Sequence, residues 1–219
     1  MRNSLALIFD MDGVIVDSTA VHTESWRRYL GRHGITIEDI ESRMLGRHND
    51  EIVRDFFAAT ELTDEAVLHH GYEKERLYRS LMAPRLADHL VPGAADFIRR
   101  HAHLPLAVAS NAEPANVDVL LEAAGIRHLF RAVINGHDVA RPKPFPDIFL
   151  RAAELLSTAP ADCVVFEDSA IGVAAARAAG MRVIGVTTTF REMTGVDLVV
   201  ANFEDGEVER WLRELPVPA

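Results

Sequence analysis

The chain has 219 residues, of which 48% are hydrophobic and 26% are charged. This length suits one large domain or a core with a smaller insert, and the apolar content is enough to bury a hydrophobic core. Asp and Glu outnumber Lys and Arg by 33 to 23, which gives a formal net charge of −10. Without a run of basic residues, such a surface repels nucleic acid and anionic membranes, so we expect neither as a partner.

Short apolar runs typical of buried strands recur along the chain. They cover residues 5–9, 104–109, 132–135, 163–166, 182–186 and 198–201. Helical patterns separate most of them and cover residues 115–124, 145–156 and 169–179. Gly125 and Gly180 follow two of these helices as stop signals. The alternation predicts an α/β fold, a doubly wound and mostly parallel sheet with helices on both faces.

A long segment near the N-terminus breaks this alternation and has the pattern of successive helices without a strand. One helical face carries His22, Trp26, Tyr29, Leu30 and His33. Helical patterns then continue through residues 51–59 and 63–82. We therefore predict an α/β core made of residues 1–16 and 87–219, with an all-helical insert of residues 17–86.

The cysteine content and the apolar runs also bear on the cellular location. Cys163 is the single cysteine, so no disulfide can form within the chain, which suits a reducing cytoplasm. The first apolar stretch is shorter than that of a signal peptide and stops at Asp10. No apolar run approaches the ~20 residues that a membrane span needs. We expect a cytoplasmic protein without membrane contact, and a monomer, because no long apolar surface stripe demands a partner.

Polar residues follow the predicted strands at their carboxyl ends, where open parallel sheets bind their ligands. They are Asp10 and Asp12 after the first strand, Ser110 and Asn111 after the second, Lys143 in the loop after the third, and Glu167 and Asp168 after the fourth. One hydroxyl, one lysine and a cluster of carboxylates are therefore expected at one edge of the sheet.

This set of side chains is suited to binding a phosphoryl group. Clustered carboxylates repel one another unless a cation lies between them, and oxygen ligands without His or Cys favour Mg²⁺. Lys143 adds a positive charge, and Ser110 with nearby backbone N–H groups can bind phosphate. The helix that begins near Ser169 directs its positive dipole end toward the cluster. Such a site neutralises a phosphoryl group so that an anionic nucleophile can approach it.

The two acids of the first motif suit covalent transfer. Asp10 can attack phosphorus and form an aspartyl-phosphate, while Asp12 can protonate the leaving oxygen and then activate water. Gly13 permits a sharp change of backbone direction after them. Each residue alone has an ordinary structural interpretation, as a turn, a helix cap or a surface loop. Their joint arrangement favours the catalytic interpretation.

Four motifs in order resemble those of the haloacid dehalogenase superfamily, a large group of aspartate-based phosphotransferases. The matching segments are residues 9–18 with Asp10-Met11-Asp12-Gly13, Ser110-Asn111, Lys143 in residues 143–147, and Glu167-Asp168-Ser169 in residues 167–172. The resemblance implies that Asp10 is the nucleophile and a metal ligand, and that Asp12 is the acid and base with its carbonyl on the metal. It implies that Ser110, Asn111 and Lys143 bind phosphate. It also implies that Asp168 completes the Mg²⁺ site, with Glu167 bound directly or through water.

The helical insert between the first and second motifs resembles the branch that contains β-phosphoglucomutase and sugar phosphatases. The resemblance implies that the insert is a mobile cap over the site. His22 occupies the place of a cap-hinge histidine in that branch, although packing beside Trp26 and Tyr29 explains it equally well. Residues 46–49 loosely match the substrate-specificity loop, in which Arg47 either binds an anionic substrate or is a solvated charge.

The segment after the second motif bears on the choice between phosphatase and mutase. The β-phosphoglucomutases carry Ser-Lys-Asn there and an arginine in the cap loop, whereas this chain has Ala112-Glu113-Pro114 and Asn49. Glu113 would repel the distal phosphate that a mutase must hold. We therefore predict a Mg²⁺-dependent phosphatase that acts on a small phosphorylated metabolite, a sugar phosphate in particular.

Three alternatives to a phosphatase differ in what they require of these residues. A phosphosugar mutase of the β-phosphoglucomutase type is the first, with Arg47 partly compensating for Glu113. The second is a non-catalytic binding protein with the same fold, which the retained set of motif residues disfavours. The third is a metal-free dehalogenase, which Asp12 disfavours because those enzymes generally lack the second aspartate.

Overall fold

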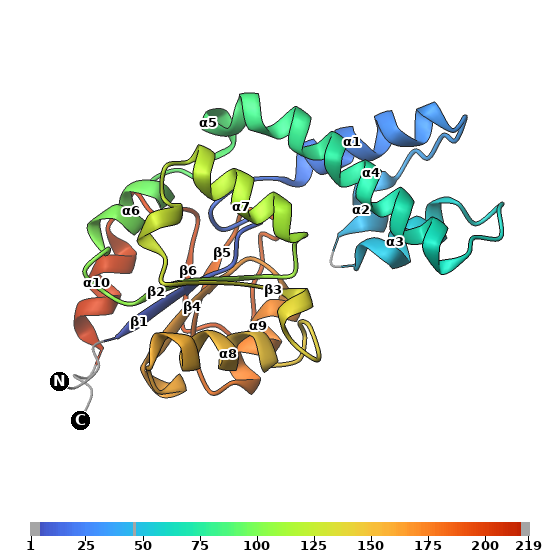
Figure 1. The fold of residues 1–219 in the computed structure, drawn as a ribbon. Helices are drawn as coiled ribbons and strands as arrows, with labels where there is room; N and C mark the ends of the chain where they lie inside the picture. The colour runs from blue at the N-terminus through green and yellow to red at the C-terminus, as the bar shows by residue number, and fades with distance from the viewer. Residues whose placement is uncertain (1–4, 46, 216–219) are drawn as a thin grey trace. The chain divides into compact units, whose positions relative to one another are not determined.

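The computed structural model describes residues 5–45 and 47–215. Its six strands are β1 (Ala6–Phe9), β2 (Leu106–Ser110), β3 (Ala132–Asn135), β4 (Cys163–Glu167), β5 (Arg182–Val186) and β6 (Leu198–Val200). They form one sheet in the order β3-β2-β1-β4-β5-β6, and every neighbouring pair is parallel (Figure 1). This is the doubly wound arrangement that the alternation of strands and helices predicts.

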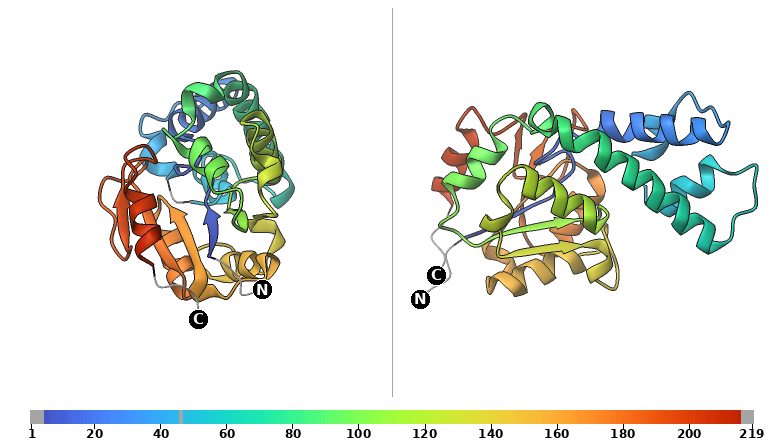
Figure 2. Two further views of the ribbon diagram at one scale, coloured as in Figure 1. Left: turned by 90° about the vertical axis from the view of Figure 1, so that its left-hand side faces the viewer. Right: turned by 45° about the horizontal axis from the view of Figure 1, so that its top comes forward.

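Helices cover both faces of the sheet (Figure 1; Figure 2). Those of the core are α5 (Leu86–His89), α6 (Ala94–Arg100), α7 (Pro114–Ala123), α8 (Asp147–Leu156), α9 (Ala170–Ala178) and α10 (Glu207–Glu214). Helices α8 and α9 lie on one face, while α6 and α7 lie on the other. Because both faces are covered, β1 is apolar at every position, and all four of its residues are fully buried.

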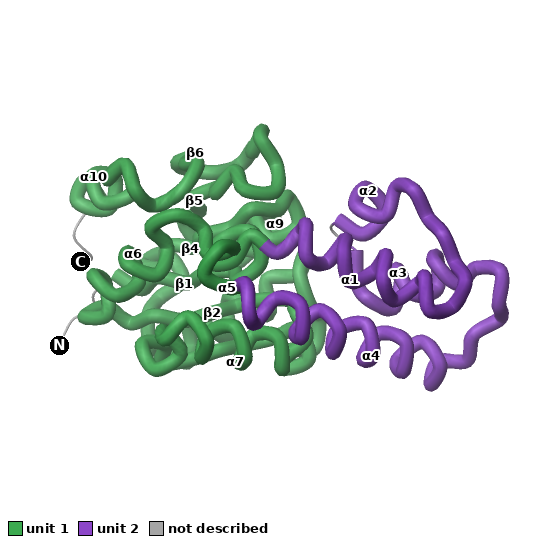
Figure 3. The backbone as a smooth tube through the Cα atoms, turned by 90° about the horizontal axis from the view of Figure 1, so that it is seen from above, with its two compact units in different colours: residues 1–17, 86–219 green, residues 18–85 purple. Residues whose placement is uncertain are grey.

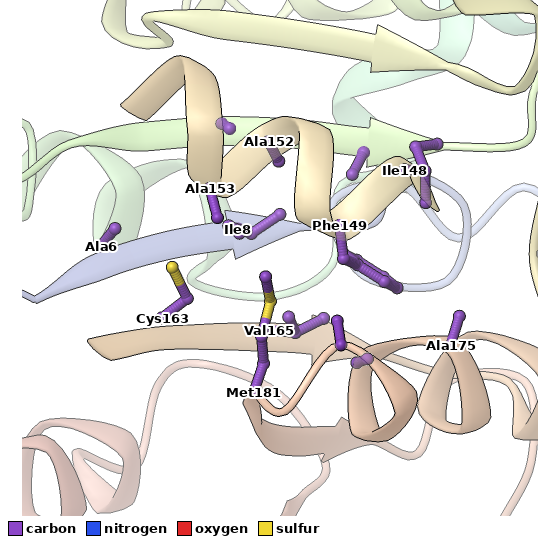
Figure 4. Close-up of a cluster of buried hydrophobic side chains, with 14 of the residues drawn as sticks. Ala6, Ile8, Ile148, Phe149, Ala152, Ala153, Cys163, Val165, Ala175 and Met181 are labelled. Atoms are coloured by element: carbon purple, nitrogen blue, oxygen red, sulfur yellow. The ribbon is translucent and has the colours of Figure 1, made fainter. Parts of the chain in front are cut away.

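Side chains of β1 alternate between the two layers of the core. Ala6 and Ile8 join the apolar cluster beneath α8 and α9, which includes Phe149 (Figure 4). Phe9 points to the opposite layer, where it stacks on Phe166 at 4.6 Å between ring centroids and meets Phe97 of α6 edge to face at 6.3 Å. The two layers fix β1 at the centre of the sheet.

Two strands extend further than their apolar runs predict. Ser110 is the last residue of β2 and pairs with Asn135, and Glu167 is the last residue of β4 and pairs with Gly185. Strand β2 also begins two residues later than predicted, because Leu104 belongs to the turn after α6 and its N–H donates to His101. Both strand extensions place polar residues of the motifs on the sheet itself rather than on a loop.

The chain divides into two compact units, residues 1–17 with 86–219 and residues 18–85 (Figure 3). The boundaries lie one residue from those expected from the sequence. The second unit holds α1 (Thr19–Arg32), α2 (Ile40–Met44), α3 (Asn49–Phe56) and α4 (Asp64–Met82). Residues 18–45 and 47–85 contain no strand. The unit has its own apolar core, in which Trp26 of α1 meets Phe56 of α3 edge to face at 5.1 Å.

Across the part of the chain that the structure describes, no helix has both the length and the apolar character needed to cross a membrane.

Candidate active site

The site lies where the order of the strands reverses, between β1 and β4. Phe9 and Phe166 are paired in these adjacent strands, and the N–H of Asp10 donates to the Phe166 carbonyl at 3.0 Å. Asp10 therefore leaves β1 directly beside Glu167 and Asp168 at the end of β4. Doubly wound sheets bind their ligands at this position, because the chain connections on the two sides diverge and leave a crevice.

A buried lysine joins the carboxylates. The Lys143 ammonium nitrogen lies 2.6 Å from Asp10 Oδ1 and 2.6 Å from Glu167 Oε1. Its side chain is 3% exposed and passes the ring face of Phe149. Asn111 holds the main chain of this residue at both ends, since its Nδ2 donates to the Lys143 carbonyl and its Oδ1 accepts from the Lys143 N–H, each at 3.3 Å. These contacts give Asn111 a positioning role toward Lys143.

Glu167 connects the lysine to the start of α9. While its Oε1 accepts from Lys143, its Oε2 accepts from the Asp168 N–H at 3.0 Å and from Ser169 through both N–H at 3.1 Å and Oγ at 2.9 Å. Ser169 is also the N-cap of α9 and accepts from the Gly172 N–H. A Cβ at Gly172 would lie 1.8 Å from Glu167 Oε1, so this carboxylate fills the space above the first turn of α9.

Three carboxylates form a group that fits a divalent cation. Among the residues that the structure describes, Asp10, Glu167 and Asp168 each offer one oxygen, and these atoms all lie within 4.8 Å of one another. All three side chains are buried. The donors are oxygen atoms alone, which Mg²⁺ prefers and Zn²⁺ does not. The residues present therefore fit the Mg²⁺ that the motifs imply.

The buried charged groups of the site shift one another's pKa values. Burial raises the pKa of Asp10 to about 7, with the Glu167 and Asp12 charges adding to the effect and Lys143 opposing it. Burial and then the Glu167 and Asp10 charges raise the pKa of Asp168 well above its usual range. Burial disfavours the charged form of Lys143, but the Asp10 and Glu167 carboxylates outweigh it and raise the Lys143 pKa. The carboxylates thus repel one another around one lysine, as expected of a site that binds a cation.

Asp12 and Ser110 are the remaining site residues that were expected in the α/β unit. Asp12 follows Asp10 in a tight turn, and its charge acts on both Asp10 and Asp168. Ser110 is 2% exposed at the end of β2, and its Oγ accepts from the Ala112 N–H at 3.2 Å. The structure thus brings every core residue expected from the sequence to the carboxyl edge of three neighbouring strands and the loop that follows β3.

The two residues expected to act from the helical unit have partners within that unit. His22 Nδ1 lies 2.8 Å from Lys74 Nζ, and its ring stacks on Tyr78 at 3.8 Å between centroids. Burial and then the Lys74 charge lower the pKa of His22 to about 3. Arg47 donates to Asp55 Oδ2 at 2.8 Å. Both side chains are therefore held by contacts that the sequence patterns do not predict.

The sequence patterns do not reveal two further polar residues. Lys74 is 2% exposed and pairs with Glu75 at 2.8 Å, inside a helix whose pattern predicts only packing. Thr189 follows β5, and its hydroxyl lies near the Asp168 carboxylate beside Gly13 and favours the charged form of that carboxyl. The rule that polar residues at strand ends approach the site, applied to the fifth strand, would have found Thr189.

A doubly wound sheet with a cluster of carboxylates and a lysine at the reversal of strand order fits a hydrolase of the α/β class. The model of the haloacid dehalogenase-like hydrolase family matches residues 5–180. The chain belongs to this family, and it is a phosphoric monoester hydrolase.

Two curated relatives and one solved structure resemble most of the chain. Fructose-1-phosphate phosphatase YqaB of Escherichia coli is 36% identical over 182 residues, which are 82% of this chain and 95% of that protein. Beta-phosphoglucomutase of Bacillus subtilis is 31% identical over 211 residues, 93% of this chain and 92% of the relative. The crystal structure of a haloacid dehalogenase hydrolase, family IA, variant 3, from Entamoeba histolytica has a TM-score of 0.84 at 25% identity and covers 97% of this chain and 98% of its own.

Proposed function

We propose that this protein is a Mg²⁺-dependent phosphatase that hydrolyses a small phosphorylated metabolite, a sugar phosphate, through an aspartyl-phosphate on Asp10. The observation that carries the proposal is the geometry around Asp10. Its carboxylate leaves the central strand, contacts the Lys143 ammonium group, and lies within reach of the Asp168 and Glu167 oxygens that fit a cation. A carboxylate in this setting can approach a phosphate whose negative charge is neutralised by its surroundings.

The reaction runs in two steps. Asp10 attacks phosphorus, the bond from phosphorus to the substrate oxygen breaks, and Asp12 donates a proton to that oxygen as the alcohol leaves. Asp12, now a carboxylate, takes a proton from water, the water oxygen attacks phosphorus, and the bond to Asp10 breaks to release inorganic phosphate. Lys143 and Ser110 bind the phosphoryl oxygens throughout, because their polar atoms are fixed at the same sheet edge.

Asp10, Asp168 and the Asp12 carbonyl would hold the cation, with Glu167 bound directly or through water. Bound Mg²⁺ supplies the positive charge that neutralises the phosphoryl oxygens. The four hydrogen bonds that Glu167 already accepts favour a supporting role for its carboxylate, since they fix Lys143 and the start of α9 at the same time.

Residues 18–85 form the cap in this proposal, and His22 and Arg47 are its candidate hinge and substrate residues. A cap of this kind excludes bulk water and selects the substrate. A sugar phosphate is supported by the 36% identity to a fructose-1-phosphate phosphatase. Glu113 supports hydrolysis over mutase chemistry, because it is the N-cap of α7, in the segment that directly follows the end of β2 at Ser110, where its charge disfavours a second phosphate.

The test is release of inorganic phosphate from a panel of sugar phosphates, polyol phosphates and nucleotides, with Mg²⁺ or with EDTA. We expect release from sugar phosphates with Mg²⁺, none with EDTA, and none from Asp10→Asn. Aluminium fluoride, which mimics the transferring phosphoryl group, should be captured by the wild-type protein in a Mg²⁺-dependent manner. Absence of release from the whole panel, or equal capture by Asp10→Asn, would reject the proposal.

A phosphosugar mutase is the second candidate, favoured by the resemblance to beta-phosphoglucomutase over 93% of this chain. It predicts conversion of β-glucose 1-phosphate to glucose 6-phosphate when the enzyme is primed with the bisphosphate. We expect inorganic phosphate instead of glucose 6-phosphate. Isomer formation faster than phosphate release would favour the mutase.

A further inference from the structure

The loop after β5 borders the candidate site, although none of the four motifs includes it. The loop starts at Thr187, whose N–H donates to the Val200 carbonyl of β6 at 2.9 Å. Its later residues line a cavity of about 130 Å³ beside Asp168, together with the start of α9; the lining residues are Asp168, Ala170, Val173, Phe190, Glu192, Met193 and Thr194. The loop is therefore anchored at one end by the sheet and reaches the Asp168 carboxylate.

Thr189 in this loop lies next to Asp168. Its hydroxyl favours the charged form of the Asp168 carboxyl and so opposes the rise in the Asp168 pKa that burial causes. Both groups approach the same side of Gly13, since a Cβ at Gly13 would lie 1.9 Å from Asp168 Oδ2 and 2.8 Å from Thr189 Oγ1. Gly13 has φ of +74°, a conformation that glycine adopts without strain. The Asp168 carboxylate and the Thr189 hydroxyl therefore lie together against the Gly13 main chain.

The buried Asp168 carboxylate lies among like charges, so a nearby hydroxyl donor would stabilise its charged form. Asp168 is 6% exposed and is surrounded by the negative charges of Glu167, Asp10 and Asp12. The Lys143 ammonium nitrogen is engaged with the first two of these at 2.6 Å each. A neutral hydroxyl donor can fix the orientation of a carboxylate without competing for a cation.

We propose that Thr189 is a positioning residue: its hydroxyl fixes the Asp168 carboxylate so that one oxygen faces Asp10 and Glu167, ready to bind Mg²⁺. The inference rests on the proposed function, because it assigns Asp168 to the cation. Residues that orient metal ligands typically change metal affinity by 10- to 100-fold when they are lost.

The experiment measures Mg²⁺ binding by isothermal titration calorimetry on the full chain without substrate, so the result does not depend on turnover. Thr189→Val keeps the shape and removes the hydroxyl, Thr189→Ser keeps the hydroxyl, and Thr188→Val is the matched change at the neighbouring position. We expect Thr189→Val to weaken Mg²⁺ affinity about 10- to 100-fold, with Thr189→Ser and Thr188→Val close to wild type. Thr189→Ala repeats the test if the valine variant has lost its native circular dichroism.

Unchanged Mg²⁺ affinity in Thr189→Val and Thr189→Ala, or an equal loss in Thr188→Val, would overturn the inference and leave the proposed function intact. Absence of Mg²⁺ binding by the wild-type protein would overturn the inference together with the proposed metal dependence. The phosphate-release panel separates the two cases, because it tests hydrolysis independently of Thr189.

Discussion

The Lys143 ammonium nitrogen lies 2.6 Å from Asp10 Oδ1, so the proposed nucleophile is paired with a buried cation. The pair brings together the first strand and a loop that lies 133 positions further along the chain. Lys143 also contacts Glu167 at 2.6 Å. One positive charge thus holds two carboxylates that repel each other, and it fixes the direction from which Asp10 presents its oxygen.

Replacement of Lys143 by Met, which has a similar volume and no charge, tests this arrangement. Two buried carboxylates would lose their shared partner, and breaking a buried ion pair on one side costs about 3–5 kcal/mol. We expect unfolding by urea at pH 8 to show a loss of this size, and phosphate release to fall about 100- to 1,000-fold.

Arg141→Met is the matched control for Lys143→Met. Arg141 lies two positions away and pairs with Asp147 at 2.9 Å, but its side chain is 57% exposed. Exposed ion pairs contribute less than about 1 kcal/mol. Equal losses in the two variants would contradict the role given to the buried lysine.

Gly172→Ala tests whether the position of Glu167 matters. The added Cβ would lie 1.8 Å from Glu167 Oε1 and 1.9 Å from its Cδ, so the carboxylate must move. Because that carboxylate holds both Lys143 and the start of α9, we expect a destabilisation of about 1–3 kcal/mol and slower phosphate release. Chemical denaturation and a steady-state assay measure the two effects.

Gly31→Ala is expected to stabilise the protein, in contrast to Gly172→Ala. Gly31 is in α1, and an added Cβ would meet no heavy atom within 4 Å beyond its chain neighbours and the backbone of its own helix. Alanine is favoured over glycine in helices by about 0.5–1 kcal/mol. The free energy of unfolding should therefore rise slightly. A decrease in the free energy of unfolding, of the size expected for Gly172→Ala, would contradict the conclusion that the space around Gly31 accommodates a methyl group.

Mg²⁺ affinity should rise with pH up to about neutrality. The pKa of Asp10 is raised to about 7 by burial and by the Glu167 and Asp12 charges. Below that pH a cation must displace a proton to bind, so affinity gains up to about tenfold per pH unit. Calorimetric titrations between about pH 5 and 8 measure this slope. Asp10→Asn should bind Mg²⁺ more weakly than the wild-type protein, and its affinity should depend less on pH. A wild-type affinity that is equal at all pH values would contradict the displacement of a proton from Asp10 by the cation.

His22 makes stability depend on pH in the acidic range. Its pKa is lowered from 6.5 to about 3, first by burial and then by the Lys74 charge. Between these values the unfolded chain binds more protons than the folded one, so the stability present above pH 6.5 is lost as the pH falls toward 3. His22→Gln should remove this loss. Urea unfolding at about pH 7.5, 6.0 and 5.0 measures this loss of stability in the wild-type protein and in His22→Gln. His48→Gln is the control, and it is expected to retain the wild-type pH dependence.

The part of the fold set by periodicity could be predicted from the sequence. The runs at residues 132–135 and 182–186 match β3 and β5 at both ends, because their apolar side chains, among them Ile134 and Val183, pack into the core. The strand ends were less accurate where a buried polar residue belongs to the strand. Glu167 completes β4 and is 1% exposed, yet hydropathy alone places it in a turn, because its burial depends on a lysine that is distant in sequence.

Partners within the site were harder to predict than its members. The strand-end rule brings Asp10, Lys143 and Asp168 to one edge, but it does not say that Lys143 pairs with Asp10 or that Thr189 contacts Asp168. Such contacts depend on side-chain direction and on the order of the strands. The buried pair of Lys74 and Glu75 could not be predicted for the same reason, since a charged pair on a helix usually indicates a solvated face.

The central place of β1 has a consequence for synthesis of the protein. Residues 6–9 leave the ribosome well before their neighbours in the sheet, which are residues 106–110 and 163–167. At translation rates of about 5–20 residues per second, β1 waits roughly 8–30 s for its second neighbour. Residues 18–85 carry their own apolar core and are complete well before then. The residues that form the apolar core of the helical unit are therefore all synthesised while the first strand, apolar at all four positions, still lacks its second neighbour in the sheet.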